Sequence, residues 1–356
     1  MSINSRSPFI RFGALVGAGA LMLGLAACGG SDTSESTAAS GSTTTESDTT
    51  AEALTGSLAG AGASSQEAAM EAWKAGYAAL QPDVAVSYDG VGSGAGITQF
   101  NDGQVSWAGS DAPLEDEEMT AAEARCGGPA WDLPVYISPV AVIFNLEGID
   151  SLNLDAATNE GVELPDLAIT PVHRSDESGT TENFTDYLTA AAPEVWTNEP
   201  AKAWPIEGGE SAAKTSGVVQ AVTAGNGTIG YADASQAGEL GTAALAAADG
   251  TFVSFSNETA AAAADTATAV EGREANDIAL AVNRVPETND SYPLILISYS
   301  IVCSTYEDAN EAALVKSFVG YQISEEGQQM ASDNAGAAPL SADMRSKIQA
   351  ALDAIK

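Results

Sequence analysis

Three kinds of residue are scarce in this chain, and each scarcity removes a class of function. The 356 residues include one histidine, His173, and three cysteines, Cys28, Cys126 and Cys303. They cannot build a His-based zinc site or a four-cysteine cluster, which leaves only a purely carboxylate metal site open. Lysine and arginine total 13 against 49 aspartates and glutamates, a net charge of −36. Such a surface repels nucleic acid, so a nucleic-acid partner is excluded.

The N-terminus has the layout of an export signal. Residues 1–27 begin with a short basic segment that contains Arg6 and Arg11. They continue through an apolar stretch and end in small residues, an order that is typical of a secretory signal peptide. The apolar stretch is too short and too rich in glycine and alanine for a membrane span. Leu25-Ala26-Ala27-Cys28 matches the bacterial lipobox, although an ordinary cleaved signal with a chance cysteine is the alternative. We predict an exported lipoprotein, anchored by a lipid on Cys28 to the outer face of the cytoplasmic membrane.

Residues 28–53 are predicted to form a flexible, acidic tether. From Ser31 to Ala53 the chain contains only Ser, Thr, Ala, Gly, Asp and Glu. Without large apolar side chains, such a segment cannot offset the entropy lost on ordering.

Two cysteines remain in the body of the exported chain. An even pair in an oxidising compartment favours a disulfide between Cys126 and Cys303, with two separate buried thiols as the alternative.

From Thr55 onward, strand-like apolar runs alternate with helical patterns, which predicts an α/β fold with a mostly parallel sheet. The predicted strands include 84–88, 105–109, 135–145 and 229–232, and the predicted helices include 70–80, 314–321 and 344–355. The alanine-rich segment 236–268 is predicted to be a mixture of weak helix and surface loop.

Small polar residues gather at four places, 60–65, 90–96, 108–114 and 174–181, mostly between a strand-like run and a helical pattern. Such turns aim backbone N–H groups and hydroxyls at one spot, and the helix dipole favours an anion there. Taken singly, Ser64, Asp111, Ser178 or Thr180 could instead cap a helix. The run 90–96 is not a phosphate P-loop, because it lacks the Lys-Ser/Thr pair.

In combination, the four segments resemble those of the phosphate-binding protein of bacterial phosphate ABC importers, the PstS family. The matching pieces are Gly-Ala-Gly-Ala-Ser at 60–64, Gly-Val-Gly-Ser-Gly-Ala-Gly at 90–96, Ala-Gly-Ser-Asp-Ala-Pro-Leu at 108–114 and Arg-Ser-Asp-Glu-Ser-Gly-Thr at 174–180. The resemblance runs from about Leu54 to the C-terminus. It implies these phosphate ligands: Ser64, Ser65, Ser93, Asp111, Arg174, Ser178, Gly179 and Thr180. Asp176 would hold the arginine in place. One departure is Ser65-Gln66, where the family often has Phe-Pro.

The resemblance also implies a fold and partners. The fold is the type II periplasmic-binding-protein fold: two α/β lobes with mixed, mostly parallel sheets, a two-strand hinge and the ligand in the cleft. Our candidates for the crossing strands are Val135–Asn145 and Tyr292–Val302. Lobe I would comprise 54–135 plus 299–356, including both body cysteines, and lobe II would be 136–298. The implied partners are inorganic phosphate and the permease subunits of an ABC importer, and the protein is expected to be a monomer.

Asp111 is the unusual member of this ligand set. A carboxylate only accepts hydrogen bonds, so it suits an anion that itself donates a proton. Phosphate near neutral pH carries at least one hydroxyl and sulfate carries none. We predict that Asp111 discriminates against sulfate, because an unpaired buried acceptor can reject an analogue by roughly 10⁴-fold.

Other functions are less well supported by the sequence. A secreted phosphatase could use Ser64, Ser93 or Ser178 as its nucleophile, but no serine lies in a Gly-x-Ser-x-Gly elbow and His173 has no defined partner. We therefore expect no enzyme activity, no cofactor and no metal, and we interpret His173 as a bystander. A binding protein for a related oxyanion such as arsenate, or a phosphate sensor, is the alternative.

Overall fold

The computed structural model describes residues 53–154, 159 and 161–356. The predicted signal peptide, the lipidation site Cys28 and the tether up to residue 52 lie outside the described residues. In the part that is described, no helix has the length and apolar character needed to cross a membrane.

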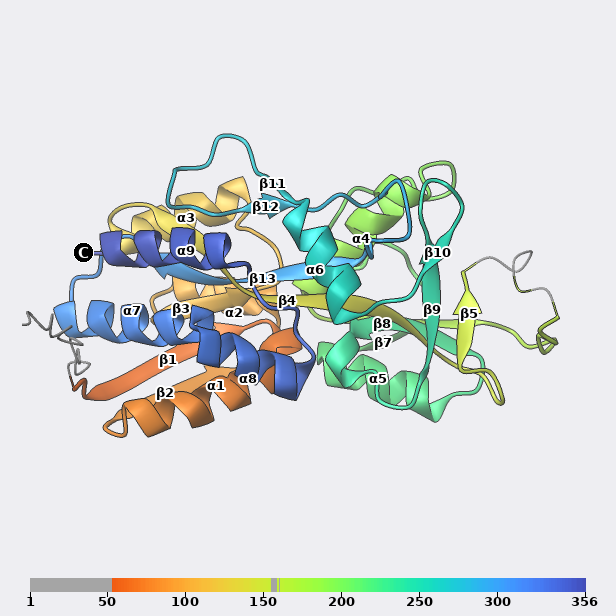
Figure 1. Ribbon diagram of the computed structural model, residues 1–356, viewed down its shortest axis with the longest axis horizontal. Helices are drawn as coiled ribbons and strands as arrows, with labels where there is room; N and C mark the ends of the chain where they lie inside the picture. Colours follow the sequence, from red (N-terminus) through yellow and green to blue (C-terminus); the bar gives the residue numbers. More distant parts are fainter. Residues whose placement is uncertain (1–52, 155–158, 160) are drawn as a thin grey trace, which may run out of the picture. The chain divides into compact units, whose positions relative to one another are not determined.

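One group of elements, which we call lobe I, is built on three parallel strands. These are β1 (Gly56–Gly62), β2 (Val84–Asp89) and β3 (Trp107–Ser110), in the order β2-β1-β3. Six helices accompany them: α1 (Glu67–Leu80), α2 (Ser93–Asn101), α3 (Asp116–Cys126), α7 (Ala309–Ile323), α8 (Glu325–Ala335) and α9 (Ala342–Ala354) (Figure 1). The helices predicted at 70–80, 314–321 and 344–355 are confirmed as α1, α7 and α9. Their apolar stripes meet in the core, where the rings of Tyr77 and Phe318 are 5.2 Å apart, edge to face.

A second group, which we call lobe II, contains short strands and the helices α4 (Gly179–Ala191) and α5 (Lys214–Ala224). Its strands are β5 (Ser151–Asn153), β6 (Thr170–Arg174), β7 (Glu210–Ala212), β8 (Thr228–Asp233), β9 (Gly241–Ala246) and β10 (Phe252–Val253). β6 pairs in parallel with β7 and with β8, so their carboxyl ends lie at one edge. Helix α6 (Asn257–Asp265) packs on the strands that connect the lobes, and β11 (Thr268–Ala269) pairs with β12 (Leu280–Ala281).

Two long strands connect the lobes, β4 (Ala130–Asn145) and β13 (Ile295–Cys303). They pair with each other in antiparallel fashion, while β13 also pairs with β3 of lobe I and β4 with β8 of lobe II. Every residue of β4 before Asn145 is buried, which explains why its sequence is mostly apolar, with Asp132 and Ser138 as buried polar exceptions. The predicted two-lobed α/β fold with two crossing strands is confirmed. β4 begins before Val135 because its first residues pair with the end of β13.

The alanine-rich segment contains a strand that the sequence did not predict. Residues 241–246 form β9, which pairs with β4, β5 and β10. Ala243, Ala244 and Leu245 of this strand are buried. Alanine favours helix locally, but pairing with neighbouring strands overrides a weak local preference. The remainder of the segment includes α6 and loops, as expected, together with the short strand β10, which was not predicted.

A disulfide joins Cys126, the last residue of α3, to Cys303, the last residue of β13. The predicted pairing is therefore present, across a sequence separation of 177 residues. The bond links α3 of lobe I to the end of the connecting strand β13. The exact lobe boundaries near residues 135 and 299 stay a prediction.

Candidate anion-binding site

The four polar segments meet where the strands of both lobes end. Ser64 and Ser65 follow β1, Ser93 begins α2, and Asp111 follows β3. From lobe II come Arg174 at the end of β6 and the residues that begin α4. The side chains of the predicted ligands are at most 3% exposed. Contacts between the two sets, described below, show that the lobes are closed over this point.

Asp111 is the centre of the contacts. Its Oδ1 accepts hydrogen bonds from Ser65 Oγ at 2.6 Å and from Ser298 Oγ, and its Oδ2 accepts one from Thr180 Oγ1 at 2.9 Å. Burial raises the pKa of Asp111, while these three hydroxyls and the nearby Arg174 guanidinium oppose the rise. The carboxylate is therefore a buried acceptor whose two oxygens both need hydrogen-bond donors.

Arg174 is held by a carboxylate on its own loop. Its Nε donates to Asp176 Oδ1 at 2.7 Å and its Nη2 donates to Asp176 Oδ2. Burial opposes ionisation of Asp176, but the guanidinium bonds and the N–H of Lys214 at 3.0 Å lower its pKa overall. Lys214 is, among the described residues, the only non-glycine residue with a positive φ, 65°. This backbone conformation carries a steric cost, and it occurs where the N–H group is aimed at Asp176.

Ser93 at the N-terminus of α2 and Gly179 at the N-terminus of α4 contact each other. The Oγ of Ser93 accepts from the N–H of Gly179 at 3.2 Å and from the N–H of Asp111 at 3.3 Å. A Cβ on Gly179 would lie 2.7 Å from the Cβ of Asp111, and one on Gly92 would lie 2.7 Å from Asp176 Oδ2. Gly92 also has a φ of 98°, which disfavours other residues. Glycine is thus needed at both positions for the lobes to meet.

Two hydroxyl residues that bond side chains of the predicted ligands were not predicted. Thr215, at the start of α5, donates its N–H to Ser64 Oγ at 3.1 Å, and the two hydroxyls are 3.2 Å apart. The small polar run Lys214-Thr-Ser-Gly217 before a helical pattern was an available signal. Ser298 lies on β13, where the register with β4 shifts between Ser298 and Tyr299. A bulge of this kind redirects a side chain, and local sequence gives no sign of it.

The capping alternatives have different outcomes. Ser178 is the N-cap of α4, and its side chain accepts from the N–H of Thr181 at 3.3 Å. Asp111 caps no helix, because α3 begins at Asp116 with Glu115 as its N-cap. Ser64 makes its side-chain bonds to Thr215 instead of a helix of its own loop. Capping therefore explains Ser178, and Ser64 satisfies an N–H group in the first turn of α5 from the opposite lobe. Asp111 alone has no capping role.

His173 lies away from this cluster. Its Nδ1 is 2.9 Å from the carbonyl oxygen of Arg174 and its Nε2 is 3.2 Å from that of Gly208. The ring stacks on Trp204, with centroids 5.2 Å apart. Both ring nitrogens meet carbonyl oxygens and neither meets a serine of the cluster, so the geometry of a serine–histidine pair is not found among the described residues.

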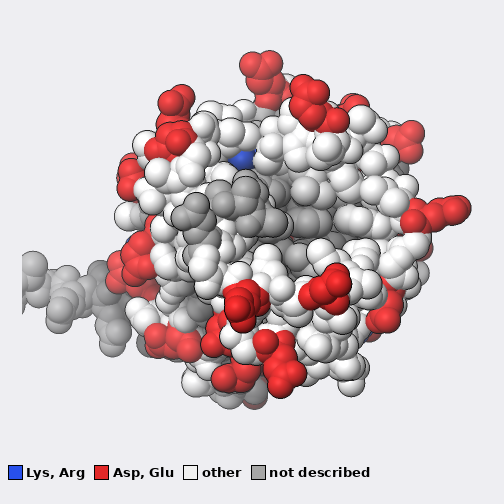
Figure 2. Space-filling view, turned by 90° about the vertical axis from the view of Figure 1, so that its right-hand side faces the viewer, with Lys and Arg blue, Asp and Glu red and all other residues white. Residues whose placement is uncertain are grey.

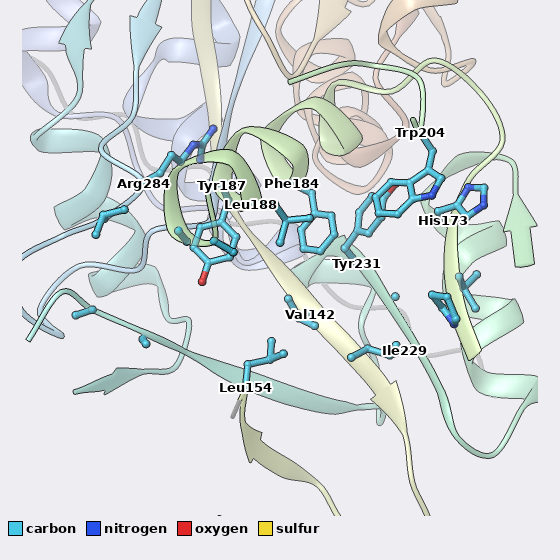
Figure 3. A pocket seen from close by; sticks show the side chains of 18 of the residues that line it. Val142, Leu154, His173, Phe184, Tyr187, Leu188, Trp204, Ile229, Tyr231 and Arg284 are labelled. Atoms are coloured by element: carbon cyan, nitrogen blue, oxygen red, sulfur yellow. The ribbon is translucent and has the colours of Figure 1, made fainter. Parts of the chain in front are cut away.

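A separate cavity of about 590 Å³ lies in lobe II. Phe184 and Tyr187 of α4 form one wall with Trp204, and Val142 and Ile229 form the opposite one (Figure 3). Figure 2 views the end of the molecule on the right of Figure 1, where acidic side chains surround a hollowed, mostly uncharged centre. None of the predicted phosphate ligands lines the cavity. Its mostly apolar walls do not suit a doubly charged anion.

Comparisons with known proteins point to one family. A family model described as a PBP superfamily domain matches residues 34–326. Phosphate-binding protein PstS 3 of Mycobacterium tuberculosis is 35% identical over 97% of this chain and 99% of its own length. The protein of that name from Mycobacterium leprae is 35% identical over 84% and 86% of the two chains. The solved structure of a high affinity periplasmic phosphate-binding protein bound with phosphate has a TM-score of 0.67 at 24% identity, covering 83% of this chain and 93% of that one. That last likeness shows the fold.

Proposed function

Because the chain belongs to the PBP superfamily and, within it, to the PstS phosphate-binding proteins, we propose that it captures inorganic phosphate and delivers it to an ABC importer. In this role it is an extracytoplasmic binding protein. The observation that carries the proposal is the buried Asp111 carboxylate, which lies among hydroxyl groups at the closed meeting of the two lobes.

The proposed site combines many donors with one acceptor. Arg174 offers a guanidinium that is positioned by Asp176, and Ser64, Ser93 and Ser178 offer hydroxyls. The N-terminus of α4 adds backbone N–H groups at Gly179 and Thr180 and the positive end of a helix dipole. Ser65 contributes its N–H group and its hydroxyl. This set gives a tetrahedral anion contact-range bonds in a buried setting, where the charge of the distant surface is largely screened.

Asp111 has to exchange partners when phosphate enters. A hydroxyl has one hydrogen, so Ser65 and Thr180 can donate either to Asp111 or to a phosphate oxygen. If they turn to the anion, Asp111 keeps a full set of hydrogen bonds only by accepting one from a hydroxyl of the phosphate itself. Sulfate cannot supply this proton, so it would leave the buried carboxylate short of donors and facing a like charge.

Export and anchoring form part of the same proposal. We place the protein on the outer face of the cytoplasmic membrane, held by a lipid on Cys28 as a monomer beside the importer. Replacement Cys28→Ala in a producing bacterial cell should move the protein from the membrane fraction to the soluble fraction. A protein that stays in the membrane fraction after this change would contradict the anchoring.

Equilibrium dialysis against radiolabelled phosphate tests the capture of phosphate. The purified protein, stripped of ligand by unfolding and refolding, should bind one phosphate per chain. Arg174→Ala should weaken binding by at least about 100-fold, since it removes a charge-assisted donor worth roughly 3 kcal/mol. Arg345→Ala is the matched control, because Arg345 pairs with Glu325 on the surface of lobe I. Equal affinities of the three proteins would place the site elsewhere.

We further propose that the protein is not a phosphatase. Both ring nitrogens of His173 face carbonyl oxygens, so it is not poised as a base for a serine. Incubation with a chromogenic phosphate ester should release no phosphate above the rate seen without protein, and release that Ser93→Ala abolishes would contradict this.

A further inference from the structure

A buried lysine bridges the two lobes beside the proposed site. The side chain of Lys202 is 6% exposed, and it lies on the segment that follows α4 in lobe II. Its Nζ is 2.6 Å from Glu118 Oε1 and 3.0 Å from Glu115 Oε1, both at the start of α3 in lobe I. A third carboxylate, Glu182 of α4, is 4.0 Å away. One ammonium group therefore meets carboxylates of both lobes.

The lobe I carboxylates are held in place by their own helix. Glu115 is the N-cap of α3 and forms a capping box with Glu118. The Oε2 of Glu118 accepts from the N–H of Glu115 at 2.8 Å, which leaves Oε1 directed at Lys202. Lys202 thus meets an acceptor that is already positioned, so the contact costs little side-chain entropy on the side of lobe I.

The backbone of Lys202 contacts the proposed anion loop. Its carbonyl oxygen accepts from the N–H of Ser178 at 3.0 Å, and Ser178 caps the helix whose first residues face the site. The neighbouring Ala201 is fixed in turn, since its N–H donates to Thr185 Oγ1 of α4 at 3.0 Å. One residue therefore holds the anion loop with its main chain and the opposite lobe with its side chain.

Charge explains why a cation is needed here. Burial would lower the pKa of Lys202, but Glu182 and Glu118 outweigh it and the net direction is up, so the ammonium form is retained. On Glu182 burial acts in the opposite direction and raises the pKa to about 7. Without Lys202, the carboxylates of lobe I would approach that of lobe II with no counter-charge. In a chain of net charge −36, this repulsion opposes closure.

We propose that Lys202 is a closure residue: its ion pairs with Glu115 and Glu118 stabilise the closed lobes and slow the release of bound phosphate. It is a positioning residue, since its ammonium group is engaged by carboxylates away from the predicted ligands. The inference rests on the proposed function, because closure matters only if an anion is held between the lobes.

Release kinetics test the inference. Phosphate release is followed by stopped flow, with a fluorescent phosphate trap mixed into the phosphate-loaded protein. Lys202→Met, which keeps the apolar stem, should release phosphate about tenfold faster with little change in the association rate, as expected when a buried charge pair loses one partner. Glu115→Gln, a milder change on the other lobe, should speed release about twofold to threefold. Lys74→Met is the control, because Lys74 pairs with Glu71 within α1.

Two further readouts separate closure from general stability. In the Lys202→Met protein, the Tm without phosphate should match that of the unmodified protein, while the rise in Tm on adding phosphate should be smaller. Combining Lys202→Met with Glu118→Gln should speed release by less than the product of the single effects. The inference would be overturned if the Lys202→Met and Glu115→Gln proteins release phosphate at the same rate as the Lys74→Met protein. If the unmodified protein binds no phosphate, the proposed function fails instead.

Discussion

Thr180 Oγ1 donates a hydrogen bond to Asp111 Oδ2 at 2.9 Å and thereby joins the start of α4 in lobe II to the end of β3 in lobe I. The bond unites the two requirements of the account, a buried acceptor and closed lobes.

Asp111→Asn should narrow the preference for phosphate over sulfate. The amide can donate as well as accept, and it removes the like charge that faces sulfate. Sulfate affinity should therefore rise, and phosphate affinity should fall as its proton loses a charged acceptor. Titration calorimetry with both anions measures the ratio. The exposed Asp102→Asn serves as control, and a ratio equal to that of the control would remove Asp111 from selectivity.

Ser298→Ala should move the acid limit of phosphate binding to higher pH. The Ser298 hydroxyl donates to Asp111 and lowers the pKa of that carboxyl, so its removal raises this pKa further. Asp111 then becomes protonated, and so a weaker, uncharged acceptor for the ligand, at a less acidic pH. Affinity measured from pH 4 to pH 8 should decline earlier in the variant. Ser300 lies on the same strand as Ser298 and donates to Gln322 of α7. Ser300→Ala should leave the pH profile unchanged.

Asp233→Asn should change how stability depends on pH. Burial raises the pKa of Asp233 from 3.8 to about 7, although Ser235 donates to it. A raised carboxyl pKa means that the folded state holds a proton more tightly than the unfolded chain. Its stabilising contribution is therefore full below pH 4 and is lost as pH rises through 7.

The amide of the Asp233→Asn protein keeps the acceptor and cannot ionise. Relative to the unmodified protein, this variant should gain stability between pH 4 and pH 8, by up to roughly 4 kcal/mol for a change of about three pKa units. Urea unfolding at several pH values measures the difference. A stability difference that does not vary with pH would contradict the burial of an ionisable group at this position.

Removal of the disulfide should affect stability more than binding. Cys126→Ala with Cys303→Ala should lower the free energy of unfolding by roughly 2–5 kcal/mol, because the bond closes a long loop. Phosphate affinity should be retained, since the bond joins the last residues of α3 and β13 and neither cysteine is a predicted ligand. Urea unfolding and calorimetry give the two quantities. A large loss of phosphate affinity at unchanged stability would contradict this assignment.

The sequence predicted the elements whose signals are local. The apolar stripes of α1, α7 and α9 and the apolar runs of β4 and β13 each reflect burial of one element, and that burial is visible in the residues themselves. Gly92 and Gly179 lie in the segments that were singled out, but the contacts that require glycine there come from the opposite lobe.

Other features depend on contacts between distant segments. Ser298 reaches Asp111 through an irregularity in the pairing of β13 with β4, and Thr215 meets Ser64 from the opposite lobe. The Lys202 cluster likewise requires knowledge of how α3 and the segment after α4 meet. β9 was missed because the helix preference of alanine is local while its strand pairing is not.

Titration calorimetry of the ligand-stripped, unmodified protein with phosphate and with sulfate tests the central claim most directly. The account predicts tight binding of one phosphate and sulfate binding that is weaker by roughly 10⁴-fold. Comparable affinities for the two anions would contradict a site in which a buried carboxylate requires a proton from its ligand.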